Sequence, residues 1–331
     1  MSYLVTGGAG FIGSHLVERL LDEGHRVICL DNFDDFYDPA LKRGNLRRAL
    51  QESRFRLIEG DLRDAGLLKK IFQEEEIENI VHLAARPGVR PSIQNPLLYA
   101  DVNIRGTMNL LEACQKHGVR RFIFASSSSV YGNNPKVPFA EEDPVDNPIS
   151  PYAATKKAGE LICHTYHHLY GLNIACLRYF TVYGPRQRPE MAIHQFTRLI
   201  DQGKKVSLFG DGNSRRDYTY IDDAIEGTMG ALSRDHGYEI YNIGESRTTS
   251  LSELIQLIEE RIGKRARIEH LPTQPGDVER TYADIRKAQR LLGHRPRTDI
   301  GEGLTRFIRW YLNEGCKGNT FTTENAESAE N

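Results

Sequence analysis

Residues 3–13 read Tyr-Leu-Val-Thr-Gly-Gly-Ala-Gly-Phe-Ile-Gly, an apolar run that passes into glycines at every third position, Gly7, Gly10 and Gly13. The run predicts a buried strand, and the amphipathic pattern over residues 11–23 predicts a helix directly behind the glycines. A side chain at such a turn would block the close approach of a pyrophosphate, and the free N–H groups of a helix N-terminus suit phosphate oxygens. The stretch therefore predicts a strand–turn–helix unit that binds a dinucleotide.

The first half of the chain continues this alternation. Short apolar runs at residues 3–6, 27–30, 55–59, 79–83, 122–126 and 173–178 alternate with amphipathic segments at residues 11–23, 103–117 and 152–170. The runs are mostly unbroken and rich in β-branched or aromatic residues, as strands buried on both faces are. We therefore predict an α/β fold of the Rossmann type, a doubly wound parallel sheet with helices on both faces.

The pattern changes after residue 184. Helices are predicted at residues 195–202, 221–232 and 250–262, the last opened by a Ser250/Glu253 capping box, and a strand at residues 239–243. We expect a nucleotide-binding domain at residues 1–182, to which the chain returns near residues 217–246. Residues 183–216 and 247–315 would form a smaller, discontinuous α/β domain for the substrate. The polar residues 317–331 would form a disordered tail.

Composition argues against several classes of protein. The 331 residues carry a formal net charge of −2, which gives no reason to expect nucleic acid or an acidic membrane as a partner. No stretch reaches the ~20 apolar residues that span a bilayer, and the first residues do not resemble an export signal. The five cysteines are scattered, without a Cys-x-x-Cys pair. We therefore expect reduced thiols, no metal site and a cytoplasmic protein.

A tyrosine–lysine pair indicates the chemistry. Tyr152 and Lys156 lie four residues apart at the start of a predicted helix, behind Pro151, which suits its first turn. A phenol of pKa about 10 is a poor base at neutral pH, and an ammonium one helical turn away favours the phenolate. Ser127 lies just past a predicted strand, at the edge where such sheets bind ligands. Together with the glycine turn, the three predict acid–base chemistry coupled to hydride transfer on a nicotinamide dinucleotide.

An aspartate at the end of the second predicted strand indicates which dinucleotide. Asp31 follows Gly10 by 21 residues, a position from which a carboxylate accepts from the adenosine ribose hydroxyls and repels a 2′-phosphate. No arginine directly follows Asp31 and Asn32. The sequence therefore favours NAD over NADP. Asp61, at the end of the third predicted strand, would flank the adenine or else lie solvated there.

With these residues, six ordered motifs make the chain resemble the extended short-chain dehydrogenase/reductase family, and within it the nucleotide-sugar epimerases. They are residues 6–15 (TGGAGFIGSH), 31–32 (DN), 82–85 (HLAA), 126–132 (SSSSVYG), 150–156 (SPYAATK) and 178–185 (RYFTVYGP). The likeness covers roughly residues 1–315. It implies bound NAD and a homodimer that pairs through the helices at residues 103–117 and 152–170.

The resemblance also implies a role for each matching residue. Tyr152 matches the family's base, Lys156 the partner that also holds the nicotinamide ribose, and Ser127 the catalytic serine or threonine. Positions that line NAD match Gly7, Gly10, Phe11, Ile12, Gly13, Asp31, Asn32, Asp61, Leu62, Leu83, Ala84, Ala85, Asn103 and Phe180. For the substrate, Arg216 matches the arginine that holds the diphosphate and Asp277 a polar residue near the nucleoside ribose. Thr181 stands where the family often has an asparagine that contacts substrate.

Two serines favour one reaction over its relatives. Related dehydratases and decarboxylases carry an acidic residue directly before the position of Val130, and 4,6-dehydratases carry Asp-Glu after the catalytic residue, whereas this chain has Ser128 and Ser129. Removing water needs a general acid and base beyond the tyrosine. The sequence therefore favours NAD-dependent C4 epimerisation of a nucleotide sugar through a 4-keto intermediate, with UDP implied by the resemblance alone. The alternatives are a dehydratase or decarboxylase of this family, and an NAD-binding scaffold without chemistry.

The sequence leaves the sugar open. Residues 181–185 together with Arg188 resemble the uronic-acid 4-epimerases, in which an arginine at this place meets the C6 carboxylate, a task that suits a planar guanidinium. Alternatively, Arg188 caps a turn or faces solvent. UDP-glucuronate/UDP-galacturonate and UDP-glucose/UDP-galactose are both candidate substrate pairs.

Overall fold

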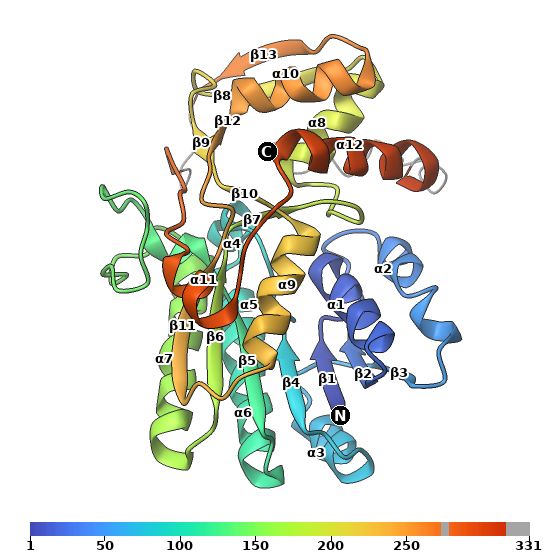
Figure 1. The fold of residues 1–331 in the computed structure, drawn as a ribbon, viewed down its shortest axis with the longest axis vertical. Coiled ribbons are helices and arrows are strands. Elements are labelled where there is room, and N and C mark those ends of the chain that lie inside the picture. Colours follow the sequence, from blue (N-terminus) through green and yellow to red (C-terminus); the bar gives the residue numbers. More distant parts are fainter. Residues whose placement is uncertain (273–277, 316–331) are drawn as a thin grey trace.

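The computed structural model describes residues 1–272 and 278–315 and has a seven-stranded sheet at its centre (Figure 1). The strand order is β11-β6-β5-β4-β1-β2-β3, and every neighbouring pair is parallel. The strands are β1 (Ser2–Thr6), β2 (Arg26–Asp31), β3 (Phe55–Glu59), β4 (Asn79–His82), β5 (Arg121–Ser127), β6 (Ile174–Tyr179) and β11 (Tyr238–Ile243). Because the order reverses between β1 and β4, the sheet is doubly wound, and the predicted Rossmann-type fold is confirmed.

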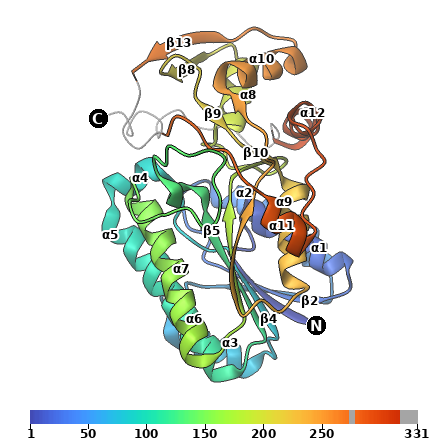
Figure 2. The ribbon, with the colours of Figure 1, turned by 60° about the vertical axis from the view of Figure 1, so that its left-hand side comes forward.

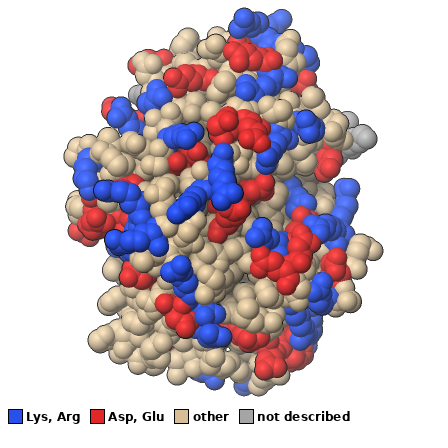
Figure 3. Space-filling model, viewed as in Figure 1, with Lys and Arg blue, Asp and Glu red and all other residues tan. Residues whose placement is uncertain are grey.

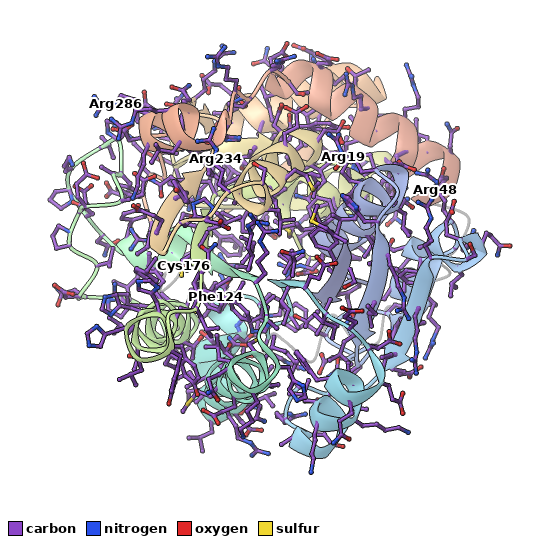
Figure 4. All side chains as sticks on the ribbon, turned by 60° about the horizontal axis from the view of Figure 1, so that its bottom comes forward. Arg19, Arg48, Phe124, Cys176, Arg234 and Arg286 are labelled. Atoms are coloured by element: carbon purple, nitrogen blue, oxygen red, sulfur yellow. The ribbon has the colours of Figure 1, made fainter. Side chains whose placement is uncertain are left out.

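Helices cover both faces of this sheet (Figure 2). On one face lie α1 (Phe11–Asp22), α9 (Ile221–Leu232) and α11 (Arg286–Leu292); on the other lie α3 (Ala65–Glu74), α6 (Gly106–His117) and α7 (Pro151–Tyr170). Neighbouring strand residues point to opposite apolar cores, as Leu4 and Val5 do. Figure 4 shows Phe124 and Cys176 on adjacent strands, on the side that α6 and α7 cover. Burial on both faces explains why the strands read as unbroken apolar runs.

A smaller group of elements lies beyond the carboxyl ends of the strands, at the top of Figure 1. It comprises α8 (Ala192–Asp201), β8 (Lys205–Phe209), β9 (Arg215–Arg216), β12 (Thr249–Ser250), α10 (Leu251–Ile262), β13 (Arg267–Leu271), α12 (Ile300–Trp310) and the π-helical turn η4 (Tyr311–Gly315). β8 pairs with β13, and β9 with β12. α10 begins with the expected capping box of Ser250 and Glu253. This group is discontinuous in sequence, because β11, which lies between β9 and β12 along the chain, belongs to the large sheet. The domain boundaries themselves stay a prediction.

Short elements occupy the connections between strands and helices. They are α2 (Pro39–Asn45), η1 (Ala49–Gln51), α4 (Val89–Gln94), α5 (Pro96–Tyr99), η2 (Ala100–Arg105), η3 (Ser128–Tyr131), β7 (Thr181–Tyr183) and β10 (Tyr218–Tyr220). β7 and β10 pair in parallel.

The helix predicted at residues 103–117 begins earlier, because α5, η2 and α6 follow one another from Pro96, a residue suited to a first helical turn. α8 likewise begins three residues before its predicted start.

The hydropathy of the helices and the distribution of surface charge bear on the sequence analysis. None of the described helices is long and apolar enough to cross a membrane. On the face in Figure 3, basic and acidic side chains are interspersed, in keeping with a net charge near zero. The cysteines within the described residues, Cys29, Cys114, Cys163 and Cys176, are buried free thiols. Asp277 and the tail expected at residues 317–331 lie outside the described residues.

Candidate active site

A cavity of about 490 Å³ opens at the carboxyl ends of the parallel strands, where the strand order reverses. This is the edge at which sheets of this type bind ligands. The sequence-predicted residues that line it are Gly7, Gly10, Phe11, Ile12, Gly13, Asp31, Asn32, Asp61, Leu62, Leu83, Ala84, Ala85, Ser127, Tyr152, Lys156, Phe180, Thr181, Arg188 and Arg216. The fold thus brings together residues that lie up to about two hundred positions apart in the chain.

The glycine turn between β1 and α1 has the shape that the sequence predicts. Gly7 adopts φ +70°, and a Cβ there would lie 2.7 Å from the Ala84 nitrogen. A Cβ at Gly13 would lie 2.2 Å from the Gly7 carbonyl oxygen. Gly10 is the N-cap of α1, and no side chain caps this helix. Its first N–H groups therefore remain available to an anion, and the turn fits the pyrophosphate of a dinucleotide.

Asp31 is fixed at the end of β2. Its Oδ2 accepts from the Ala9 N–H at 3.0 Å and its Oδ1 from the Phe33 N–H at 2.9 Å. The residue is 7% exposed, and burial raises the pKa of its carboxyl. Its place beside the glycine turn suits a ribose diol rather than a 2′-phosphate. The site as a whole fits NAD.

Asp61 lines the same end of the cavity with its carboxylate already engaged. Arg63 donates to it through Nε and Nη2, and Asn32 donates from Nδ2 at 2.9 Å. The hydrogen bonds from Arg63 lower the pKa of Asp61 to about 2. Asp61 is therefore ionised, and its neighbours hold its carboxylate in a fixed position in the cavity wall. It is not a freely solvated carboxylate at a strand end.

Tyr152 and Lys156 are presented by the first turns of α7. Ser150 caps this helix by accepting from the Ala153 N–H at 3.1 Å, and Pro151 occupies its first turn. Lys156 is 4% exposed; its Nζ donates to the Ala125 carbonyl at 2.7 Å and lies 6.0 Å from the centre of the Tyr152 ring. Burial lowers the pKa of Lys156 to about 8. The ammonium is thus held on the same side of the helix as the phenol, as the spacing predicts.

Ser127 connects this pair to the end of β5. Its Oγ accepts from the N–H and the hydroxyl of Ser129 at 3.2 and 2.9 Å. Burial raises the pKa of Tyr152, whereas its hydrogen bond with Ser127 and the charge of Arg188 act in the opposite direction. The arrangement can move a proton between the Tyr152 hydroxyl and a ligand hydroxyl that both it and Ser127 contact.

Two arginines face the cavity from outside the large sheet. Arg188 lies in the segment between β7 and α8; its side chain is 24% exposed, and its Nε is 2.8 Å from Glu190 Oε1. The direction of this contact leaves the Nε–H without a hydrogen-bond acceptor. Arg216, on β9, donates from Nη1 to the Arg215 carbonyl at 3.0 Å. Arg188 therefore contributes its charge to the cavity beside Tyr152 and does not simply face solvent.

One predicted residue that the structure describes is not brought to the cavity wall. Asn103 was expected to line NAD, but its side chain is 3% exposed and bonds the backbone of Arg86 and the hydroxyl of Thr155, so it lies behind the wall. Asp277 falls outside the described residues. The motifs in turn missed wall residues that follow β2 and β4, namely Asp34, Phe36, Tyr37, Lys42 and Arg86. The available signal was their place in loops at the carboxyl edge of predicted strands.

A protein-family model, sequence relatives and solved structures are similar to this chain over most of its length. A family model described as GDP-mannose 4,6 dehydratase matches residues 4–307. The UDP-glucuronate 4-epimerase of Thermodesulfobacterium geofontis is 47% identical over 93% of this chain and 95% of its own. A Bacillus cereus UDP-glucuronic acid 4-epimerase, solved with UDP-glucuronic acid and NAD, is 41% identical with a TM-score of 0.89 over 94% of this chain and 99% of that one. A Thermotoga maritima UDP-glucose 4-epimerase, solved with UDP-glucose, is 37% identical with a TM-score of 0.87 over the same shares.

Proposed function

The chain belongs to the extended short-chain dehydrogenase/reductase family, in its GDP-mannose dehydratase-like group, and on that premise we propose that it is an NAD-dependent UDP-sugar 4-epimerase that interconverts UDP-glucuronate and UDP-galacturonate. The observation that carries the choice of sugar is the Arg188 guanidinium, which lines the same cavity as Tyr152, Lys156 and Ser127. A guanidinium there suits the C6 carboxylate of a uronic acid.

The mechanism assigns one task to each catalytic residue. Tyr152 removes the proton of the sugar C4 hydroxyl, Lys156 favours the phenolate form by its charge, and Ser127 holds the hydroxyl against Tyr152. NAD, when bound, would accept the hydride from C4 and later return it to the same carbon. After the planar 4-keto sugar has turned over in the cavity, Tyr152 returns the same proton. No net oxidation results, because the oxidation and the reduction occur on one carbon.

The distribution of carboxylates supports epimerisation over dehydration. Among the described residues, the acidic side chains that line the cavity are Asp31, Asp34 and Asp61. Asp31 ends β2, Asp34 follows it, and Asp61 follows β3, so none of them belongs to the segments that carry the catalytic tyrosine and serine. Ser128 and Ser129 occupy the wall beside Ser127. Elimination of water from C5 and C6 would need an acid–base pair at this end of the cavity.

The nucleotide sugar would lie between the sheet and the smaller group of elements, which forms the proposed substrate domain at residues 183–216 and 247–315. Arg216 would hold the diphosphate, Thr181 the sugar and Asp277 the nucleoside ribose. We further propose a cytoplasmic homodimer that pairs through α6 and α7. Exposed apolar side chains on these helices, Met108, Leu161 and Leu169, support the pairing, and the buried free thiols support a reducing compartment.

The test is to incubate the purified protein with UDP-glucuronate and follow the sugar by proton NMR, without added nicotinamide. We expect UDP-galacturonate to form with no stoichiometric NADH, because the cofactor is regenerated in each cycle. Tyr152→Phe should retain the fold and bound NAD but lose at least ~100-fold in turnover, the usual effect of removing a general acid–base group. NADH that accumulates in proportion to substrate would instead identify a dehydrogenase, and near-normal turnover of Tyr152→Phe would remove that residue from the mechanism.

A further inference from the structure

Asp34 and Arg86 form an ion pair across the cavity. Arg86 Nη1 contacts both carboxylate oxygens of Asp34, and both side chains line the cavity. Asp34 lies in the loop after β2 and Arg86 in the loop after β4, whereas β1 lies between these two strands in the sheet. A bridge between the two loops therefore crosses the end of β1, where the glycine turn begins. We call this pair of residues the strap.

The Asp34 end of the strap is held by its own loop. The Asp34 N–H donates to Asn32 Oδ1 at 3.0 Å, and Asp34 Oδ1 accepts from the Phe36 N–H at 2.9 Å. The Asp34 carbonyl accepts from Lys42 Nζ at 2.6 Å, which ties the loop to α2. These bonds fix the backbone on both sides of the carboxylate, so little conformational entropy remains to be lost when the ion pair forms.

The Arg86 end is fixed by Asn103. The Arg86 N–H donates to Asn103 Oδ1 at 2.7 Å, and Asn103 Nδ2 donates to the Arg86 carbonyl at 3.1 Å. The same amide donates to Thr155 Oγ1 at 3.0 Å, and Thr155 lies between Tyr152 and Lys156 on α7. The residue expected to touch NAD thus anchors the strap to the catalytic helix.

The environment makes this ion pair stronger than an ordinary surface pair. The side chains of Arg86 and Asp34 are 20% and 31% exposed, and the Arg86 guanidinium lies 5.4 Å from the centre of the Phe36 ring. The Arg188 guanidinium also lies near this ring, 5.9 Å from its centre. Partial exclusion of water reduces screening of the two charges.

We propose that the strap retains NAD, so that the dinucleotide leaves only after the Asp34–Arg86 ion pair opens. The sugar nucleotide does not need to cross the strap, because Arg188 and Arg216 approach the cavity from the smaller group of elements. Retention suits a reaction that returns the cofactor to its starting state in every cycle. The inference rests on the proposed NAD site but not on the identity of the sugar.

The experiment measures the rate at which bound NAD exchanges. Wild type, Asp34→Asn, Arg86→Met and the double variant are loaded with radiolabelled NAD and chased with an excess of unlabelled NAD. Asp34→Asn is nearly isosteric and retains an oxygen for the Phe36 N–H. Each single variant should release NAD about 2- to 5-fold faster, as expected for loss of one partly exposed ion pair. The double variant should release it no faster than the faster single variant, because both substitutions remove one interaction.

The matched control is Arg19→Met, which breaks the exposed pair between Arg19 and Glu23 at the end of α1. Arg19, labelled in Figure 4, does not line the cavity. The rate of this variant should equal that of wild type, and circular dichroism should show all variants folded. A rise in ionic strength should also speed release from wild type but not from Arg86→Met. Unchanged rates in both single variants, or multiplied effects in the double variant, overturn the strap. A wild type that binds no NAD at all would overturn the proposed function instead.

Discussion

Arg188 is the residue on which the proposed choice of sugar rests. Its guanidinium lies in the cavity wall, with one neighbouring carboxylate, Glu190, that is 41% exposed. The Nε–H of Arg188 has no well-directed acceptor among the described residues. A carboxylate that entered the cavity would compete with Glu190 for this guanidinium, because a partly exposed ion pair is weak. These contacts support the proposal that Arg188 recognises an anionic group on the substrate.

Arg188→Gln should separate the two sugar classes. A charge-assisted contact contributes about 1.5–3 kcal/mol, so kcat/KM for UDP-glucuronate should fall roughly 10- to 150-fold. UDP-glucose has a hydroxymethyl group at C6 and should lose far less. Steady-state kinetics on both substrates provide the measurement, with Glu190→Gln as the control, since it keeps the guanidinium. Equal losses on the two sugars would mean that Arg188 supports its loop and does not recognise the sugar.

At the scale of elements, α7 must keep its position against β5 and β6 to present Tyr152 and Lys156. Glu160, two turns beyond Tyr152, is fully buried and accepts from Arg178 Nε and Nη2 at 2.8 and 2.9 Å and from Ser126 Oγ at 2.6 Å. Burial alone would raise the pKa of Glu160, but the bonds from Arg178 hold it below its usual value. This contribution to stability is full above the ordinary glutamate pKa and is lost as pH falls through the lowered value.

Glu160→Leu should therefore destabilise the protein strongly. It leaves the buried Arg178 guanidinium without its carboxylate partner, which costs about 3–5 kcal/mol. The double variant Glu160→Leu/Arg178→Met should recover most of that loss, because it removes both charges. Urea unfolding followed by circular dichroism gives the values, and Glu59→Leu, which breaks the exposed pair with Arg43, should stay within about 1 kcal/mol of wild type. A double variant as unstable as Glu160→Leu alone would show that packing, not charge, is responsible.

Part of this organisation was predictable from sequence because the information is local. The strands, the glycine turn and the Tyr152–Lys156 pair depend on periodicity and on spacing within one turn, and the cavity forms where strand ends meet. The Asp34–Arg86 and Glu160–Arg178 pairs depend on which loops and strands become neighbours, which periodicity does not report. The same reason explains Asn103: its motif position suggested a ligand contact, whereas the fold uses its amide to hold the backbone of Arg86.

At the scale of the whole molecule, the exposed apolar side chains are concentrated on one side. Large exposed hydrophobic residues on the segment from α4 to α7 are Ile93, Leu97, Met108, Leu161, Leu169 and Tyr170. Figure 2 shows α6 and α7 side by side at the outer surface of the molecule. Leu161 and Leu169 are eight residues apart on α7, so they share one face of the helix. An apolar surface of this kind favours a second copy of the chain as its partner.

If α7 forms the proposed dimer interface, Leu161→Glu/Leu169→Glu should give a monomer, because the two substitutions place four carboxylates in a symmetric interface. Light scattering after size exclusion should give about twice 37.6 kDa for wild type and 37.6 kDa for the variant. Leu50→Glu, at an equally exposed leucine on η1 and away from α7, should remain a dimer. The proposed catalytic residues Tyr152, Lys156 and Ser127 line one cavity of the same chain, so we expect the monomer still to form UDP-galacturonate. A wild type that elutes as a monomer would contradict the proposed dimer. A double variant that stays dimeric would show that the dimer interface does not include this face of α7.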